Sequence, residues 1–113
     1  MKKNKKSTFV SRDYYIKSKT INHNAWVFGS KGNDRMFIGL TTKDKPVFDK
    51  KTKKIYNVIK LPDNPEPNNN EKCYAVDNIY IDNVNNFKSR KTTWKTSKDN
   101  RKKYNTIIKK HKK

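Results

Sequence analysis

The chain has 113 residues, and its 29 Lys and Arg against 10 Asp and Glu give a formal net charge of +19 at pH 7. Only 31% of the residues are hydrophobic, which supports one modest core and a single domain. The lone cysteine, Cys73, excludes an intramolecular disulfide and a zinc site built from several thiolates. The longest weakly charged stretch, residues 20 to 30, is too short to span a bilayer. We therefore expect no membrane span, no export and a cytoplasmic location.

The excess of positive charge predicts a polyanionic partner. Lysines and arginines that neutralise phosphates release condensed counterions, so nucleic acid is the favoured partner and no membrane partner is expected. Two alternatives stay open. The charges would also suit an acidic membrane surface or an acidic protein, and a compositional bias toward lysine and asparagine would produce them without a function.

The domain boundaries follow from where charge gives way to apolar residues. Residues 1 to 8 are expected to be a disordered basic arm, because like charges repel and there is little to bury. A single small domain is predicted over residues 9 to 110. Residues 111 to 113 are expected to be a basic tail.

The first strands are predicted by β-branched and aromatic residues. Residues 12 to 19 read as a strand. The most apolar segments are residues 25 to 29 and 36 to 42, and the Gly-Asn-containing stretch 30 to 34 between them predicts a hairpin loop.

The middle of the chain alternates between loops and strands. Residues 43 to 54 are predicted to be a basic loop, since Pro46 opposes both helix and ladder pairing. Residues 54 to 61 are predicted to be a strand because of their β-branched content. Residues 62 to 71 hold three prolines and four asparagines, which is typical of a loop.

Short strands and a helix complete the predicted pattern. Residues 73 to 76 and 79 to 81 are expected to be strands. From Ser97 the period becomes helical, because Ser97 is suited to cap a helix and Asp99 to occupy its first turn. The apolar positions at helical spacing are Tyr104, Ile107, Ile108 and His111. The predicted fold is mainly β, a small strongly bent sheet or SH3-like barrel of about five strands with a C-terminal helix.

Three stretches resemble segments of the MazF/PemK-like toxins, which are small SH3-like barrels that cleave RNA. They are Arg-Asp-Tyr-Tyr-Ile-Lys-Ser at residues 12 to 18, Met-Phe-Ile-Gly-Leu-Thr-Thr-Lys at residues 36 to 43, and Tyr-Ala-Val-Asp-Asn-Ile-Tyr-Ile-Asp at residues 74 to 82. A terminal helix after a basic segment is also shared. The resemblance covers roughly residues 9 to 110 through the order and spacing of these strings.

The resemblance implies a metal-independent endoribonuclease that needs no cofactor. In that family the 2′-hydroxyl of the RNA attacks the adjacent phosphorus, and by position Arg12 and either Thr41 or Thr42 match the catalytic arginine and threonine. The resemblance also implies RNA, in preference to DNA, as the nucleic acid. It implies a homodimer and a cognate antitoxin as the protein partners. Asp13 stands where the family has proline, and its carboxylate is able to pair with Arg12, so a descendant that binds without cleaving stays open.

The candidate contacts to nucleic acid lie near the second tryptophan. Trp94 is surrounded by Arg90, Lys91 and Lys95, which predicts base stacking beside phosphate contacts. The helix residues Arg101 and Lys102 would extend this patch. The competing interpretations are a tryptophan at the rim of the core and a solvated helix face.

His23 has two interpretations of its own. An imidazole is able to shuttle protons near neutral pH, and a histidine between Asn22 and Asn24 is also typical of a turn. The leading hypothesis is a nucleic-acid-binding, MazF/PemK-like ribonuclease acting on single-stranded RNA. The alternatives are a non-catalytic DNA- or RNA-binding accessory protein of a phage, plasmid or other mobile element, and a docking protein whose tails order on binding.

Overall fold

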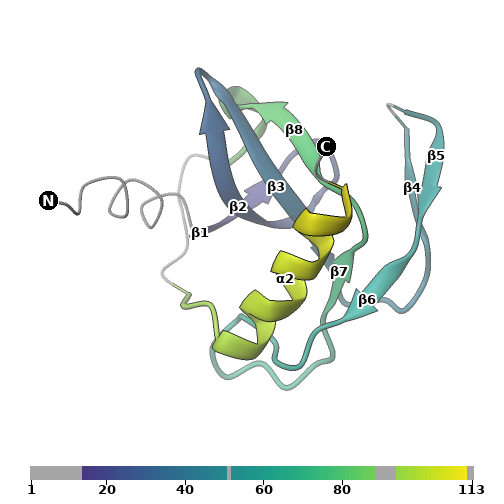
Figure 1. Cartoon of the computed structure of the whole chain (residues 1–113), viewed down its shortest axis with the longest axis vertical. Helices are drawn as coiled ribbons and strands as arrows, with labels where there is room; N and C mark the ends of the chain where they lie inside the picture. The colour runs from purple at the N-terminus through teal and green to yellow at the C-terminus, as the bar shows by residue number, and fades with distance from the viewer. Residues whose placement is uncertain (1–13, 51, 89–93, 112–113) are drawn as a thin grey trace, which may run out of the picture.

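The computed structural model describes residues 14–50, 52–88 and 94–111, and Figure 1 shows the course of the chain. Within these residues, six strands form one antiparallel sheet, two form a separate hairpin, and one α-helix follows. The strands are β1 (Tyr14–Ser18), β2 (His23–Lys31), β3 (Asp34–Thr41), β4 (Val47–Asp49), β5 (Lys54–Tyr56), β6 (Val58–Lys60), β7 (Tyr74–Val76) and β8 (Tyr80–Asn83). The short 3-10 helix η1 (Val84–Asn86) follows β8, and the α-helix is α2 (Lys98–His111). The prediction of a mainly β fold with a C-terminal helix is confirmed.

The predicted hairpin of the two most apolar segments is present as β2 and β3. The strands pair up to Lys31 and Asp34, and Gly32 turns the chain at φ +60°, a conformation that costs glycine little. β2 begins at His23, two residues before the predicted start at Ala25. The reason is its pairing with β1 on the other side, which draws an asparagine-flanked histidine into the ladder.

The basic loop predicted over residues 43 to 54 is wrong from Val47 onward, because β4 occupies Val47–Asp49 and β5 begins at Lys54. Phe48 pairs with Ile55 across the two strands. In the turn, the side chain of Asp49 accepts a hydrogen bond from the amide of Thr52 at 3.4 Å. The sequence prediction missed this hairpin because the segment is rich in lysine. A short pattern of apolar residues on either side of a turn is nevertheless sufficient to form one.

The strand predicted over residues 54 to 61 is divided into β5 and β6, which belong to different sheets. The division falls at Asn57, whose carbonyl oxygen accepts a hydrogen bond from the amide of Asp77 at 2.8 Å. The two later strands that the sequence predicted are present as β7 and β8. The described residues therefore hold more strands than the five or so expected.

The main sheet is bent at β3 and stays open. The first half of β3 pairs with β8, whereas Leu40 and Thr41 pair with β7. After β8 the chain returns to β1, where an isolated antiparallel bridge joins Ser18 to Phe87. The described sheet is thus a strongly bent sheet and not a closed barrel, with strand order β1-β2-β3-β7-β6 and β8 beside β3.

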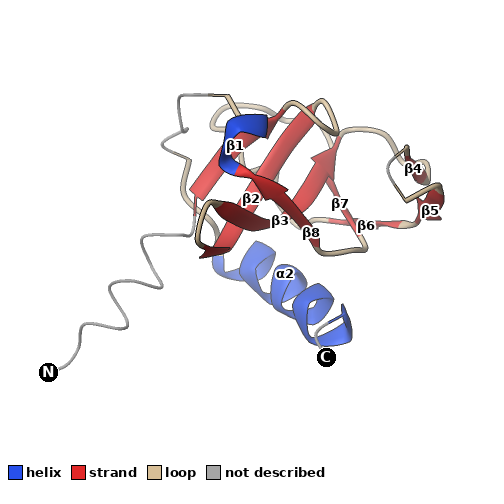
Figure 2. Cartoon of the chain, turned by 90° about the horizontal axis from the view of Figure 1, so that it is seen from above, coloured by secondary structure: helices blue, strands red, loops and turns tan. Residues whose placement is uncertain are grey.

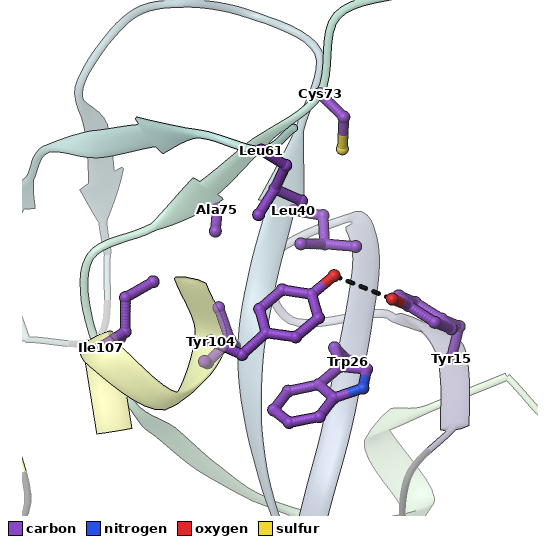
Figure 3. Packing of buried hydrophobic residues seen from close by; sticks show 9 residues of the cluster. Tyr15, Trp26, Leu40, Leu61, Cys73, Ala75, Tyr104 and Ile107 are labelled. Carbon is purple, nitrogen blue, oxygen red and sulfur yellow. Dashed lines mark hydrogen bonds between the residues drawn. The ribbon is translucent and has the colours of Figure 1, made fainter. Parts of the chain in front are cut away.

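Apolar residues cover both faces of this sheet. Helix α2 lies against one face, as Figure 2 shows, and Tyr104 stacks on Trp26 with ring centroids 4.2 Å apart. Figure 3 shows this cluster. Its buried members are Tyr15, Trp26, Ile38, Leu40, Leu61, Cys73, Ala75, Tyr104 and Ile107. The second cluster comprises Ile16, Ala25, Val27, Phe37, Val76, Tyr80 and Phe87.

A chain of hydrogen bonds crosses the helix-covered cluster. The hydroxyls of Tyr15 and Tyr104 lie 2.8 Å apart. Thr96 donates its hydroxyl to the Tyr15 oxygen at 3.2 Å and accepts the indole N–H of Trp26 at 3.2 Å. Polar atoms that would otherwise be buried without partners are thereby paired, which fixes α2 on the sheet.

The predicted start of the helix is confirmed. Ser97 Oγ accepts the amide of Asn100 at 3.1 Å, and Asp99 lies in the first turn. The side chain of Asn100 is 1% exposed. It accepts the amide of Asp63 at 3.1 Å and donates to the carbonyl of Asp63 at 2.9 Å. This pair of bonds ties the N-terminal end of α2 to the proline-rich loop.

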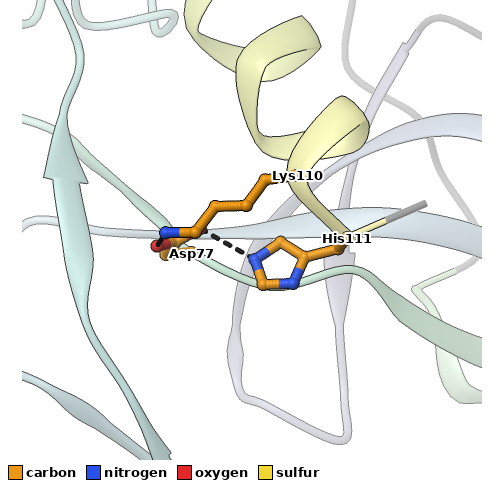
Figure 4. A network of polar contacts seen from close by, with 3 residues as sticks. All are labelled: Asp77, Lys110 and His111. Carbon is orange, nitrogen blue, oxygen red and sulfur yellow. Dashed lines mark hydrogen bonds and ion pairs between the residues drawn. The ribbon is translucent and has the colours of Figure 1, made fainter. Parts of the chain in front are cut away.

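The other end of α2 is held by an acidic residue after β7 (Figure 4). Asp77 accepts hydrogen bonds from Lys110 Nζ at 2.6 Å and from His111 Nε2 at 2.9 Å. Burial raises the pKa of Asp77, but the bonds from Lys110 and His111 outweigh it and the net pKa lies below its ordinary value. Both ends of α2 are therefore anchored.

In the described part of the chain, no helix has the length and apolar character needed to cross a membrane.

Candidate functional site

Two adjoining hollows open where the β1–β2 turn, the end of β3 and the β4 hairpin strand meet. The large hollow has a volume of about 420 Å³ and the small hollow about 100 Å³. His23 and Thr41 line both of them, so we call the pair of hollows the His23–Thr41 cleft. The large hollow falls within the range of about 300–1,000 Å³ that is usual for small-molecule sites.

The register of β2 and β3 brings the two residues of the cleft to one end of the sheet. Ala25 pairs with Gly39, and His23 lies two residues before Ala25 while Thr41 lies two residues after Gly39. A Cβ at Gly39 would lie 2.8 Å from Cδ1 of Ile21. Glycine therefore lets the β1–β2 turn pack closely on β3 beside the cleft.

The environment of His23 favours its neutral form. Partial burial, together with the positive charges of Lys17 and Lys43, holds the pKa of His23 below its ordinary value. Near neutral pH the imidazole is thus unprotonated. A neutral imidazole is able to accept a proton from a hydroxyl that approaches it.

Thr41 is buried, with 6% of its surface exposed. Its Oγ1 accepts a hydrogen bond from the backbone N–H of Lys43 at 3.2 Å. Because the hydroxyl oxygen is the acceptor in this bond, the O–H proton is left to donate to a ligand. The neighbouring Thr42 is exposed and lines the small hollow.

The large hollow combines a basic rim with one acidic residue. Lys43, Lys45 and Lys50 line it, and all three are exposed. Asp49 also lines it and is 9% exposed. This arrangement suits a ligand that is anionic over most of its length.

The small hollow is bounded by Trp94 and by part of the proline-rich loop. Trp94 is half-buried, and its ring centroid lies 5.5 Å from that of Tyr15, so it forms the rim of the core as well as the wall of the hollow. Cys73 lies in the same wall. Burial raises the pKa of its thiol to about 11, so near neutral pH the thiol is protonated and unsuited to act as a nucleophile.

The structure brings together some of the residues that the sequence predicted. Thr41, Thr42 and Trp94 share the small hollow. Three further described candidates do not line either hollow: Lys95, Arg101 and Lys102. Three candidates lie outside the described residues: Arg12, Arg90 and Lys91. The interpretation of His23 as a turn residue is wrong, because His23 is the first residue of strand β2. Its interpretation as a proton shuttle stays a hypothesis.

Sequence reasoning missed the contribution of the β4–β5 hairpin to the cleft. Phe48 and Asp49 both line the large hollow, and so does Tyr80 from β8. Phe48 and Ile55 are apolar residues on either side of a polar turn, and this pattern is the signal that would have found the hairpin.

No protein-family model, curated protein or solved structure matches the chain. Within the described ranges, the His, Cys, Asp and Glu side chains form no group of three or more that could hold a metal ion.

Proposed function

We propose that the chain binds RNA in the His23–Thr41 cleft and cleaves it without a metal ion, in the manner of the MazF/PemK-like toxins that it resembles. The observation that supports this most is the position of Thr41, one of the two threonines that the resemblance selects. It lies in the wall of a cleft that also holds a histidine of lowered pKa and three lysines. The net charge of +19 favours a polyanionic strand as the ligand.

The proposed reaction is an internal transesterification. The ribose 2′-hydroxyl attacks the adjacent phosphorus, the bond to the 5′-oxygen of the next nucleotide breaks, and a 2′,3′-cyclic phosphate and a 5′-hydroxyl result. His23 accepts the proton of the attacking hydroxyl. Thr41 donates a hydrogen bond to the phosphorane, and Lys43 stabilises its negative charge. The leaving 5′-oxygen takes up a proton from water, and His23 releases its proton to solvent, which restores the neutral imidazole. Arg12, outside the described residues, keeps the role that the resemblance implies, which is to handle the proton or the developing charge of the phosphorane.

Incubation of long single-stranded RNA with the purified protein in the presence of a chelator tests this proposal. Fragments that end in cyclic phosphate are expected, and Arg12→Ala is expected to abolish them. His23→Gln and Thr41→Val are each expected to slow cleavage by about 10²-fold or more, since a general base and a transition-state hydrogen bond each contribute on that scale. RNA that remains intact with the wild-type protein would refute cleavage.

Binding without cleavage is the second candidate function. The burial of Thr41, at 6% exposure, favours it, because a reacting phosphate must come within hydrogen-bond distance of the hydroxyl. This candidate is an accessory protein that binds DNA or RNA. Retention of RNA at low salt, with no cleavage and no effect of Thr41→Val, would support it over the ribonuclease.

The remaining proposals concern location and assembly. We propose that the protein is located in the cytoplasm, that it forms a homodimer and that an antitoxin protein binds it. Sedimentation at several concentrations tests the dimer. A mass equal to one chain, 13.4 kDa, across that range would contradict it.

A further inference from the structure

We infer that the large hollow is a base-binding pocket for one nucleotide of the bound strand, and that it prefers bases with an amino group. The inference rests on the proposed function and deepens it, because it extends recognition from the phosphates to a base. The inference depends on three side chains that line the large hollow. They are the exposed ring of Phe48, the buried carboxylate of Asp49 and the covered hydroxyl of Tyr80.

The aromatic ring belongs to Phe48. It lines the large hollow and is 55% exposed, although it is one of the larger apolar side chains. It lies on β4, and Figure 1 shows the β4–β5 hairpin projecting from the body of the protein. A base that stacks on an exposed aromatic ring gains about 1–3 kcal/mol. The hollow of about 420 Å³ has room for such a base.

Tyr80 lines the large hollow and carries a covered hydroxyl. Tyr80 is 9% exposed, and its buried hydroxyl has no partner with hydrogen-bond geometry among the described residues, although the side chain of Asn78 lies near it. Burial raises the pKa of Tyr80, and the negative charge of Asp49 raises it further. Both residues line the large hollow. A covered hydroxyl without a well-placed partner calls for an explanation, and the edge of a bound base would supply that partner once the side chains that cover the hydroxyl make way for it.

The carboxylate of Asp49 determines which bases suit the pocket. A carboxylate accepts hydrogen bonds and donates none, so it pairs with the amino groups of guanine, adenine and cytosine. Uracil has no amino group and places carbonyl oxygens on both sides of its single ring N–H. An amino-bearing base is therefore favoured over uracil.

The mixture of charges also distinguishes a nucleotide from a simple anion. Lys43, Lys45 and Lys50 line the hollow and suit phosphates, but a pocket for phosphate alone would be weakened by a buried carboxylate. Asp49 also stabilises the hairpin turn, because its Oδ1 accepts a hydrogen bond from the backbone N–H of Thr52. Asp49→Asn keeps an oxygen for that bond and removes the charge.

The test is an NMR titration of the full chain with guanosine, adenosine, cytidine and uridine 5′-monophosphates, and with ribose 5-phosphate as a probe without a base. The three amino-bearing nucleotides are expected to bind at least about fivefold more tightly than the uridine nucleotide, the lower range of side-chain discrimination between bases. Asp49→Asn is expected to remove this difference. Phe48→Ala is expected to weaken all four nucleotides about tenfold and to leave ribose 5-phosphate unchanged.

Ile55→Ala provides the matched control. Ile55 is the cross-strand neighbour of Phe48, is 68% exposed and does not line the hollow, so its removal should change no affinity. Equal binding of all four nucleotides, or an equal loss in Ile55→Ala and Phe48→Ala, overturns the inference. Binding of long single-stranded RNA is measured in parallel. If RNA binds while the nucleotides are not discriminated, the inference fails and the proposed function stands; if the nucleotides are discriminated but RNA does not bind, the proposed function fails.

Discussion

At the scale of single residues, the contact between Tyr15 and Tyr104 joins the sheet to the helix. Tyr104→Phe removes one of two hydroxyls that lie 2.8 Å apart in a fully buried position. We expect the free energy of unfolding to fall by about 1–2 kcal/mol, the usual result when a buried polar group loses a partner. Urea unfolding followed by tryptophan fluorescence measures it.

The double variant Tyr15→Phe/Tyr104→Phe sharpens this prediction. The two single losses should sum to more than the loss in the double variant, because removal of both oxygens leaves fewer groups unpaired. Additive losses would show that the two hydroxyls do not interact.

His23 makes a pH-dependent contribution to stability. Its pKa is lower in the folded chain than the ordinary value of about 6.5 expected in the unfolded chain. Between these two values the unfolded chain binds more protons, so folded stability falls as the pH drops below about 6.5 and levels off below the folded pKa. His23→Gln should lose less stability than the wild type between pH 7 and pH 5. Parallel stability curves for the two proteins would contradict the assignment.

At the scale of elements, Asn100 fixes the start of α2. Its side chain makes two bonds to the backbone of Asp63 while 1% exposed. Asn100→Ala should lower the free energy of unfolding by about 1–3 kcal/mol, since it leaves both backbone groups of Asp63 without these partners. The control is Asn105→Ala on the exposed side of the same helix, where a change within about 0.5 kcal/mol is expected. Equal effects in chemical denaturation would show that the loop contact does not hold the helix.

The other end of α2 is sensitive to acid through Asp77. Because the pKa of Asp77 is lower in the folded chain, its stabilising effect is present above the unfolded pKa of about 3.9 and is lost as the pH falls through the folded pKa. Asp77→Asn should cost about 1 kcal/mol at pH 7, a small value because Lys110 is 59% exposed. The gap between variant and wild type should close below pH 4. A gap that persists in acid would exclude the carboxylate as its cause.

The elements differed in how well the sequence predicted them. The β2–β3 hairpin and α2 were predictable, because Gly32 and Ser97 occupy positions where the turn and the cap need those residue types. The β4–β5 hairpin was not, since its strands have three residues each and stand among lysines. Short strands carry too few apolar residues to produce a period, and their stability comes from packing of Val47 and Tyr56 against the second core cluster.

At the scale of the whole molecule, the charge was predictable from composition but its arrangement was not. Thr41 and Thr42 were selected as alternatives by resemblance, whereas Phe48 and Asp49 line the cleft only because the hairpin folds beside β3. Such proximity depends on tertiary packing between segments that composition treats as separate. Of the residues predicted to bind nucleic acid, Trp94 lines the small hollow, whereas Lys95, Arg101 and Lys102 line neither hollow. Arg90 and Lys91 lie outside the described residues.

The central claim is that the cleft, and not the overall charge, binds nucleic acid. The most direct test titrates labelled single-stranded RNA with two variants that each replace three exposed lysines by glutamine. One variant alters the cleft lysines, Lys43, Lys45 and Lys50. The other alters three lysines that do not line the cleft, Lys31, Lys60 and Lys72.

Both variants have the same net charge, so a difference between them reports position. The cleft variant should bind RNA at least about tenfold more weakly than the control variant, and the slope of log K against log salt should fall by about 2 units, or about 0.7 for each phosphate that the protein no longer neutralises. Equal reductions of affinity and slope in the two variants would contradict the claim, because they would mean that the strand senses only the net charge.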